Sequence, residues 1–205
     1  NKNNKIIKVI VADVCYDDNG LSTPVIPLGA GLVAAHAKAV NPEIAVSVYK
    51  GKTSLIEEIK TNAPDILGLT NYLWNNNLAI RIANIAKKIN PNVLIVFGGP
   101  EIDKSPENQS IMYEKYSIAD FFIQYEGELA FANLVKRYLE LDLDKNKLKK
   151  EILKLGNCFI IENNEIISGP NLHRIEDLDL TPSPYTTGLL DKFLVDPDYM
   201  PMIQT

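Results

Sequence analysis

The chain has 205 residues, which is enough for one ordinary domain with a smaller addition. Its net charge of -5 and its lack of a dense Lys/Arg stripe argue against a nucleic-acid partner. No apolar run approaches the roughly 20 residues that span a bilayer, and Cys15 and Cys158 are too few for a disulfide framework, a zinc site or an iron–sulfur cluster. We therefore expect a cytoplasmic protein without nucleic-acid or membrane partners.

The first part of the chain alternates between strand and helix patterns. Residues 6–11 form a continuous apolar run, which predicts a strand buried on both faces. Residues 28–40 carry small or apolar side chains at helical spacing after a polar loop. Residues 44–49 have the alternating pattern of an edge strand, residues 55–62 predict a short helix, and the apolar run at 66–69 predicts a third strand.

The same alternation continues through the middle of the chain. Residues 75–90 form the clearest amphipathic helix, and the Asn residues at its start are competent N-caps. The most apolar strand is predicted at residues 93–97, and a helix is predicted around residues 107–116. A fifth strand at residues 120–125 leads into a last helical pattern, which runs from residue 126 to 139.

Five strands that alternate with helices predict an α/β fold with a doubly wound, flavodoxin-like (Rossmann-like) sheet of five parallel strands. Because residues 44–49 resemble an edge strand, the expected strand order is 2-1-3-4-5.

Beyond residue 142 the pattern changes. Two apolar segments around Glu162-Asn163-Asn164 predict a small β-hairpin, and Pro182 and Pro184 predict an extended linker. We expect an α/β domain over residues 1–141, followed over residues 142–205 by a helix, the hairpin and a linker that leads to a domain absent from this sequence.

Ligands of open parallel sheets bind beyond the carboxyl ends of the strands, and Gly98-Gly99 is the sharpest feature at that edge. Two residues without Cβ atoms allow a flat ligand, or another backbone, to approach closely. A tight turn between strand and loop explains the pair equally well.

Two further loops at this edge have a binding and a structural explanation. Residues 70–75 place Tyr72 and Trp74 among amide side chains, which suits a large, partly apolar ligand but also suits a helix start with two packed aromatic rings. Glu126 and Glu128 stand at a helix start, where acidic residues complement the helix dipole in any case.

Other kinds of site lack their residues. A phosphorylated receiver domain needs an Asp at the end of its third strand, where Thr70 and Asn71 stand instead. The loop after the first strand has neither GxGxxG nor a P-loop, which argues against a dinucleotide or nucleoside triphosphate. His36 has the position of a packed core residue, and no Ser/His/Asp or Cys/His arrangement can be assembled, so we expect no catalytic residue and no metal ligand in this chain.

Taken in order, these loops resemble the cobalamin (vitamin B12)-binding domain at the N-terminus of cobalamin-dependent radical-SAM enzymes. The resemblance covers most of the chain, including the hairpin and the linker. It implies a corrin ring over the carboxyl edge of the sheet, a nucleotide tail that runs toward Gly98-Gly99, and contacts of residues 70–74 with the ring. The residues that it implies as cofactor contacts are Pro27, Leu28, Gly29, Thr70, Asn71, Tyr72, Leu73, Trp74, Gly98, Gly99, Pro100, Glu101, Glu126, Gly127 and Glu128.

The sequence departs from that family in one place. Many cobalamin domains carry DxHxxG after the first strand, with the His as the lower cobalt ligand, whereas the segment from Asp13 to Gly20 contains no His. The resemblance therefore implies cobalamin without an imidazole from this loop, so that the lower cobalt position is empty, water-filled or ligated by the cofactor's own base.

The resemblance also implies a parent enzyme. A barrel holding a [4Fe-4S] cluster and S-adenosylmethionine would follow the linker and pack against this domain, and the whole would be a methyltransferase or catalyse another radical reaction. This chain alone would then be inactive. Two alternatives stay open at this point: a cofactor-free flavodoxin-like docking or regulatory domain, and the nucleotide-sugar-binding half of a transferase.

Overall fold

The computed structural model describes residues 6–102, 105 and 109–203. Its strands are β1 (Lys8–Cys15), β2 (Ala45–Gly51), β3 (Ile66–Thr70), β4 (Leu94–Gly98), β5 (Phe121–Ile123), β6 (Cys158–Glu162) and β7 (Glu165–Ser168). Its helices are α1 (Leu28–Val40), α2 (Lys52–Thr61), α3 (Asn76–Ile89), α4 (Gln109–Lys115), α5 (Gly127–Glu140), α6 (Lys145–Lys150) and α7 (Asp191–Leu194), with short 3-10 turns at η2 (Ile152–Lys154) and η3 (Leu178–Leu180).

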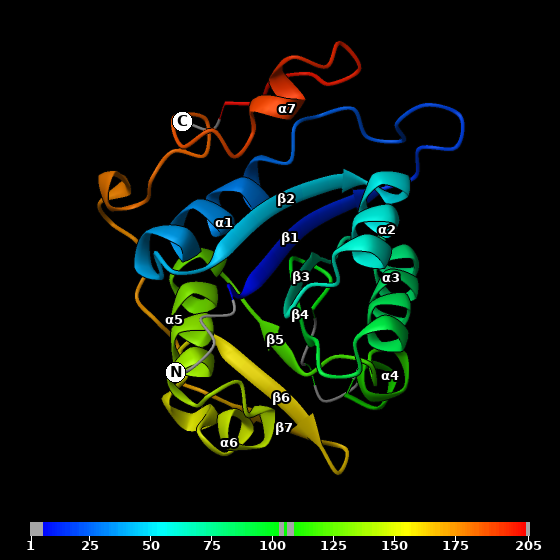
Figure 1. Ribbon diagram of the computed structural model, residues 1–205. Coiled ribbons are helices and arrows are strands. Elements are labelled where there is room, and N and C mark those ends of the chain that lie inside the picture. The colour runs from blue at the N-terminus through cyan, green and yellow to red at the C-terminus, as the bar shows by residue number, and fades with distance from the viewer. Residues whose placement is uncertain (1–5, 103–104, 106–108, 204–205) are drawn as a thin grey trace.

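The sheet has the order β2-β1-β3-β4-β5-β6-β7, and its first five strands are parallel. This confirms the flavodoxin-like prediction, including the order 2-1-3-4-5. Helices α1 and α5 cover one face of the sheet, and α2, α3 and α4 lie on the other (Figure 1). Because both faces are covered, the central strands are apolar throughout.

The hairpin joins the main sheet, which the sequence did not predict. Strand β6 pairs with β5 in antiparallel register, with Phe122 opposite Phe159, and the two rings stack with centroids 4.8 Å apart. The edge of β5 that would otherwise be open is thereby paired. The division near residue 142 remains a proposal, because continuity of a sheet alone does not define a domain.

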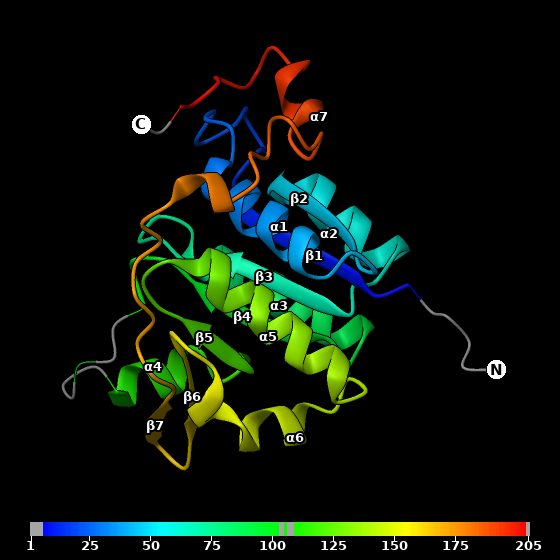
Figure 2. The same cartoon turned by 90° about the vertical axis from the view of Figure 1, so that its left-hand side faces the viewer.

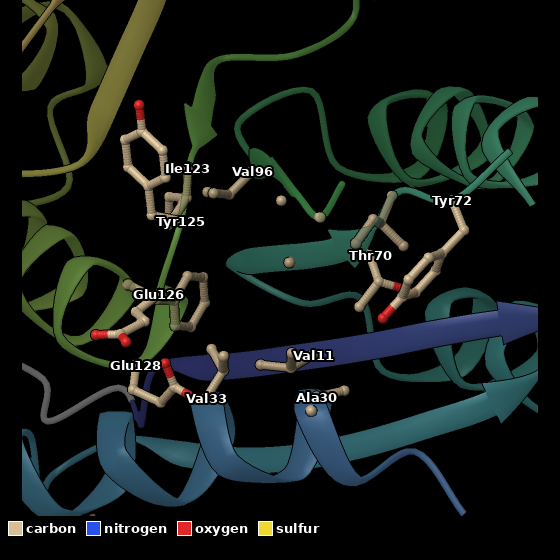
Figure 3. Close-up of a pocket in the computed structure, with 17 residues that line it drawn as sticks. Val11, Ala30, Val33, Thr70, Tyr72, Val96, Ile123, Tyr125, Glu126 and Glu128 are labelled. Carbon is tan, nitrogen blue, oxygen red and sulfur yellow. The ribbon is translucent and has the colours of Figure 1, made fainter. Parts of the chain in front are cut away.

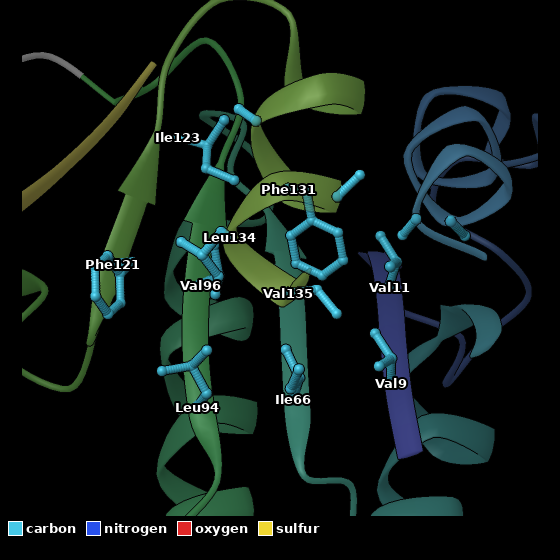
Figure 4. Close-up of a cluster of buried hydrophobic side chains, with 14 of the residues drawn as sticks. Val9, Val11, Ile66, Leu94, Val96, Phe121, Ile123, Phe131, Leu134 and Val135 are labelled. Carbon is cyan, nitrogen blue, oxygen red and sulfur yellow. The ribbon is translucent and has the colours of Figure 1, made fainter. Parts of the chain in front are cut away.

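The core under α5 is built from alternate residues of the strands. Figure 4 shows Phe131, Leu134 and Val135 of α5 lying over one face of β1, β3, β4 and β5. Successive side chains of a strand point to opposite faces, so the remaining strand residues pack under α2, α3 and α4. None of the helices in the described part of the chain is long and apolar enough to cross a membrane.

The predicted extended linker is wrong between residues 184 and 194. This segment forms turns and then α7, and it buries Pro184, Leu190 and Phe193. A Cβ on Gly31 of α1 would lie 3.0 Å from Pro184 Cβ and 3.2 Å from both Leu190 Cδ atoms. The apolar side chains of the linker and this bare patch of α1 favour docking over extension.

Farther on, the linker is fixed at two more points. Met200 forms a parallel bridge with Val25, and the N–H of Ile26 donates to Met200 O at 3.0 Å. The Lys192 ammonium lies 3.7 Å from the centre of the Tyr49 ring, a cation–π contact with β2.

Gly99 is a glycine that the fold itself requires. Its φ is +116°, and a Cβ at this position would lie 2.7 Å from Asn71 O and 2.9 Å from Asn71 N. Gly98 differs, since a Cβ there would meet its nearest neighbour, Ile123 O, at 3.7 Å. The backbone conformation and packing therefore require glycine at position 99 but not at position 98.

We predict that Gly99→Ala lowers the free energy of unfolding by about 1–3 kcal/mol, because it combines an unfavourable φ with a clash against backbone. Gly98→Ala serves as the control and should change it by less than about 1 kcal/mol. Urea unfolding measures both variants, and equal stabilities would contradict this assignment.

We also predict that Gly31→Val displaces the docked linker, because Pro184 and Leu190 leave no room for the new side chain. Trypsin should then cleave after Lys192 several-fold faster than in the wild-type chain. Asn133→Val, at an exposed position of α5, is the matched control. Unchanged cleavage in the Gly31 variant would show that the linker is not held by this contact.

Candidate functional site

A cavity of about 310 Å³ opens at the carboxyl edge of the sheet, between the strand ends and helices α1 and α5 (Figure 3). Its apolar floor comes from the strands, and α1 and α5 each contribute one wall. The lining residues of the floor are Val11, Gly68, Leu69, Val96 and Ile123, and those of the walls are Gly29, Ala30, Val33, Gly127, Glu128 and Phe131. The rim consists of Thr70, Tyr72, Gly98, Gly99, Tyr125 and Glu126.

Two of the lining glycines are not required by the packing of the protein. A Cβ on Gly29 would have no atom within 4 Å, and a Cβ on Gly98 would make only ordinary contacts. Neither residue has a positive φ. Their missing side chains keep the cavity open, whereas Gly68 lies under the Phe131 ring, which a Cβ there would approach to 3.2 Å.

Aromatic side chains lie on two sides of the cavity mouth. Tyr72 and Trp74 are stacked with centroids 4.7 Å apart and planes 6° from parallel, and Trp74 is 61% exposed. On the opposite side, Tyr125 is 72% exposed and has φ +58° (Figure 3). Large apolar side chains left in solvent around a cavity are typical of a ligand site.

Polar contacts fix the strand ends beside the cavity. The Asp13 carboxylate accepts hydrogen bonds from Lys50 Nζ at 2.8 Å and from Thr70 Oγ1 at 2.9 Å. Lys50 is only 3% exposed, so this partly buried ion pair ties β1 to β2, and the Thr70 hydroxyl extends it to β3. Burial, and then the charge of Asp13, raises the pKa of Tyr72 above its usual value.

The loop after β3 is held from inside by two asparagines. Asn75 occupies the N-cap position of α3, but its side chain does not cap the helix: it accepts from Tyr72 N at 2.8 Å and donates to Val14 O at 3.1 Å. Asn71 is fully buried and donates to the Tyr116 hydroxyl at 2.8 Å. These contacts position Tyr72 and its stacked neighbour Trp74 at the rim.

The predicted contacts fall into two groups. Those that line the cavity are Gly29, Thr70, Tyr72, Gly98, Gly99, Glu126, Gly127 and Glu128. Those that do not line it are the buried Pro27, Leu28 and Asn71, the exposed Leu73, Trp74 and Pro100, and the half-buried Glu101.

Sequence reasoning missed Tyr125, Phe131 and the α1 residues Ala30 and Val33. The last three carry the pattern of a helix core, which is also how they pack, so no signal distinguishes them. Tyr125 directly precedes the predicted Glu126-Gly127-Glu128, but its positive φ and exposure are visible only in the structure.

A second cleft, of about 840 Å³, adjoins the cavity and shares Glu126 and Glu128 with it. The Glu126 carboxylate is engaged there: it accepts from Ile175 N at 2.8 Å and from Arg174 Nε at 3.0 Å. These two contacts, the backbone N–H first, lower the pKa of Glu126 against the opposing effect of burial.

His36 is buried, as its position in α1 predicted, and neither of its ring nitrogens has a hydrogen-bond partner among the described residues. Burial lowers the pKa of His36, and the charge of Glu128 partly opposes this. Among all the residues that the structure describes, no cluster of three or more His, Cys, Asp or Glu side chains is arranged to hold a metal ion.

The chain is similar to known proteins in sequence and in fold. TokK, a cobalamin-dependent radical SAM methyltransferase of Streptomyces tokunonensis, is 31% identical over 173 residues, which are 82% of this chain and 24% of that protein. An uncharacterised methyltransferase of Pyrococcus horikoshii is 31% identical over 177 residues, covering 83% of this chain and 36% of the other. The chain thus spans about a quarter to a third of the length of these relatives.

The structure of OxsB, a cobalamin-dependent S-adenosylmethionine radical enzyme solved with aqua-cobalamin and S-adenosylmethionine bound, aligns with a TM-score of 0.68 over 93% of this chain and 26% of that one. At 18% identity this shows a shared fold. The family model described as the B12 binding domain matches residues 21–135, which is more than half of the sequence. The chain therefore belongs to the B12-binding domain family.

Proposed function

We propose that this domain binds cobalamin with the nucleotide tail in the cavity between α1 and α5 and the corrin ring over the aromatic rim. The observation that carries the proposal is the open cavity at Gly29 and Gly98, two glycines that neither the backbone conformation nor the packing requires. The comparisons support cobalamin as the cofactor, and the assignment of residues to its parts is our own.

The size and lining of the cavity favour the tail over the ring. A volume of about 310 Å³ is at the lower end for small-molecule pockets, so part of a corrinoid would fit and a whole corrinoid would not. The apolar floor under Phe131 suits a planar aromatic base. The exposed faces of Trp74 and Tyr125 suit the underside and edge of a broad ring.

The end of β1 and the loop after it would supply no imidazole to the cobalt. The segment from Asp13 to Gly20 contains no His, the Asp13 carboxylate already accepts two hydrogen bonds, and Cys15 is buried. When bound, cobalamin supplies a cobalt centre that accepts and donates a methyl group. In this proposal the residues of the chain hold the tail, orient the ring and leave its upper face open.

We further propose that the full-length protein is a cobalamin-dependent radical-SAM methyltransferase or a related radical enzyme. The relatives named above support this, and the matched segment is only a fraction of each. A [4Fe-4S] cluster and S-adenosylmethionine would then be held by a barrel outside this chain, which would pack against the domain. A cytoplasmic location fits this proposal, as does inactivity of residues 1–205 alone.

The decisive experiment adds hydroxocobalamin to the purified chain and follows the visible spectrum through desalting. A retained spectrum with one equivalent bound is expected. A cofactor-free docking domain, or the nucleotide-sugar-binding half of a transferase, would retain none.

We predict that Gly29→Leu weakens cobalamin binding at least tenfold, because the new side chain enters the space reserved for the tail. The free energy of unfolding should change by less than about 1 kcal/mol, since no atom lies within contact of that Cβ. Ala39→Leu, the same kind of change at an exposed position of α1, is the control for both measurements. Wild-type affinity in the Gly29 variant would remove this cavity from the binding site.

The role of the tail can be separated from that of the ring with cobinamide, which lacks the nucleotide. We expect cobinamide to bind the wild-type chain at least tenfold more weakly than cobalamin. Gly29→Leu should weaken the binding of cobalamin but not that of cobinamide. If the variant weakened both ligands equally, the cavity would be holding the ring or acting indirectly.

A further inference from the structure

One segment of the chain connects the cavity wall to the docked linker. Residues 170–176, here called the strap, follow the hairpin and pass beside α1 and α5 at the carboxyl edge (orange in Figure 2). The first residues of the strap are held by Asn157, whose N–H donates to Pro170 O at 2.8 Å and whose Oδ1 accepts from Leu172 N at 2.8 Å. It is then held by the two contacts of Ile175 and Arg174 with the Glu126 carboxylate.

The Glu126 carboxylate lies near two sets of hydrogen-bond donors: those of the strap and the N–H groups at the start of α5. It is the N-cap residue of α5, and no side chain caps this helix. The first N–H groups of a helix lack intrahelical partners and attract negative charge. Gly127 and Glu128, which carry two of these groups, line the cavity. In the structure the carboxylate binds the strap and leaves the helix start free.

These alternatives exclude one another, because one carboxylate cannot bind both sets of donors fully. A carboxylate released from the strap would be drawn to the helix start, and Arg174 would no longer offset its negative charge at the cavity rim beside Glu128. Both effects oppose a nucleotide tail, which carries a phosphate. With the strap bound, Arg174 offsets the charge of Glu126.

We propose that Glu126 is a positioning residue that couples the strap to the cofactor cavity: binding of its carboxylate to the strap keeps the start of α5 available to the cofactor. This rests on the proposed cobalamin site. Coupling of this kind is reciprocal, so cobalamin should also stabilise the docked strap.

The test uses the whole 205-residue chain and three variants at low ionic strength. Arg174→Ala removes one holder of the carboxylate while leaving the carboxylate itself. The double variant Glu126→Ala/Arg174→Ala removes the arginine and the carboxylate together. Arg81→Ala, at an exposed arginine of α3, is the matched control. Hydroxocobalamin titration gives the affinity, and amide hydrogen exchange over residues 170–176, with and without hydroxocobalamin, reports the strap.

Arg174→Ala should weaken hydroxocobalamin binding about two- to five-fold, the scale of an exposed ion pair, and should speed exchange of the strap amides in the cofactor-free chain. The double variant should bind hydroxocobalamin more tightly than Arg174→Ala alone, because the competing carboxylate is gone. The loss of hydroxocobalamin affinity in Arg174→Ala should be smaller at high salt, which screens exposed charges. Hydroxocobalamin should slow strap exchange in the wild-type chain.

Any one of three results would overturn the inference. The first is an unchanged rate of strap amide exchange in Arg174→Ala. The second is a double variant that binds hydroxocobalamin no more tightly than Arg174→Ala, and the third is a rate of strap exchange that does not change when hydroxocobalamin is added. The second of these would assign Glu126 a direct attractive contact with the cofactor instead. Failure of the wild-type chain to bind hydroxocobalamin would refute the proposed function. The exchange measurement without cofactor would still show whether Arg174 and Glu126 hold the strap.

Discussion

The carboxyl edge of this sheet is organised by a close backbone contact between two neighbouring loops. The N–H of Asn71 donates to Gly98 O at 2.6 Å, the N–H of Glu101 donates to Asn71 O at 3.2 Å, and Gly99 fits between them only because it has no Cβ. Asn71 is therefore buried and anchored to Tyr116, while Tyr72 and Trp74, the residues that follow, are turned outward to the rim. The shape of the proposed binding surface depends on this junction.

The cavity itself depends on a different property of glycine. Gly99 supplies a conformation, whereas Gly29 and Gly98 supply space, because their absent side chains would meet little or no protein. Phe131 closes the floor above Gly68, so the space has a defined depth. A pair of glycines in a sequence does not reveal which of these two roles each member has.

The fold was predictable because each central strand is an uninterrupted apolar run and each helix has an apolar stripe. The runs at 66–69 and 93–97, for example, are typical of strands covered on both faces. The attachment of the hairpin was not predictable, since it depends on the pairing of Phe122 with Phe159, which lie far apart in the sequence. The docked linker was hidden for the same reason, because local proline chemistry says nothing about a bare surface on α1.

The candidate site was predictable in outline, because the topology brings the loops after β3, β4 and β5 to one edge. Its details were not. The Glu126 carboxylate was expected to serve the helix dipole or a cofactor and instead binds Ile175 and Arg174, which follow it by about fifty residues. Contacts of this kind belong to tertiary structure and leave no periodic trace in the sequence.

The stacking of Phe122 on Phe159 has a consequence for how small a working version of this protein can be. A polypeptide that stopped after the last residue of the five-stranded unit would leave β5, three residues long, with bare amides and carbonyls on one side and an uncovered phenyl ring beneath. Such a species would tend to recruit another chain in place of the lost strand. The five-stranded unit is thus completed only by β6, which lies beyond the last helix of that unit in the sequence.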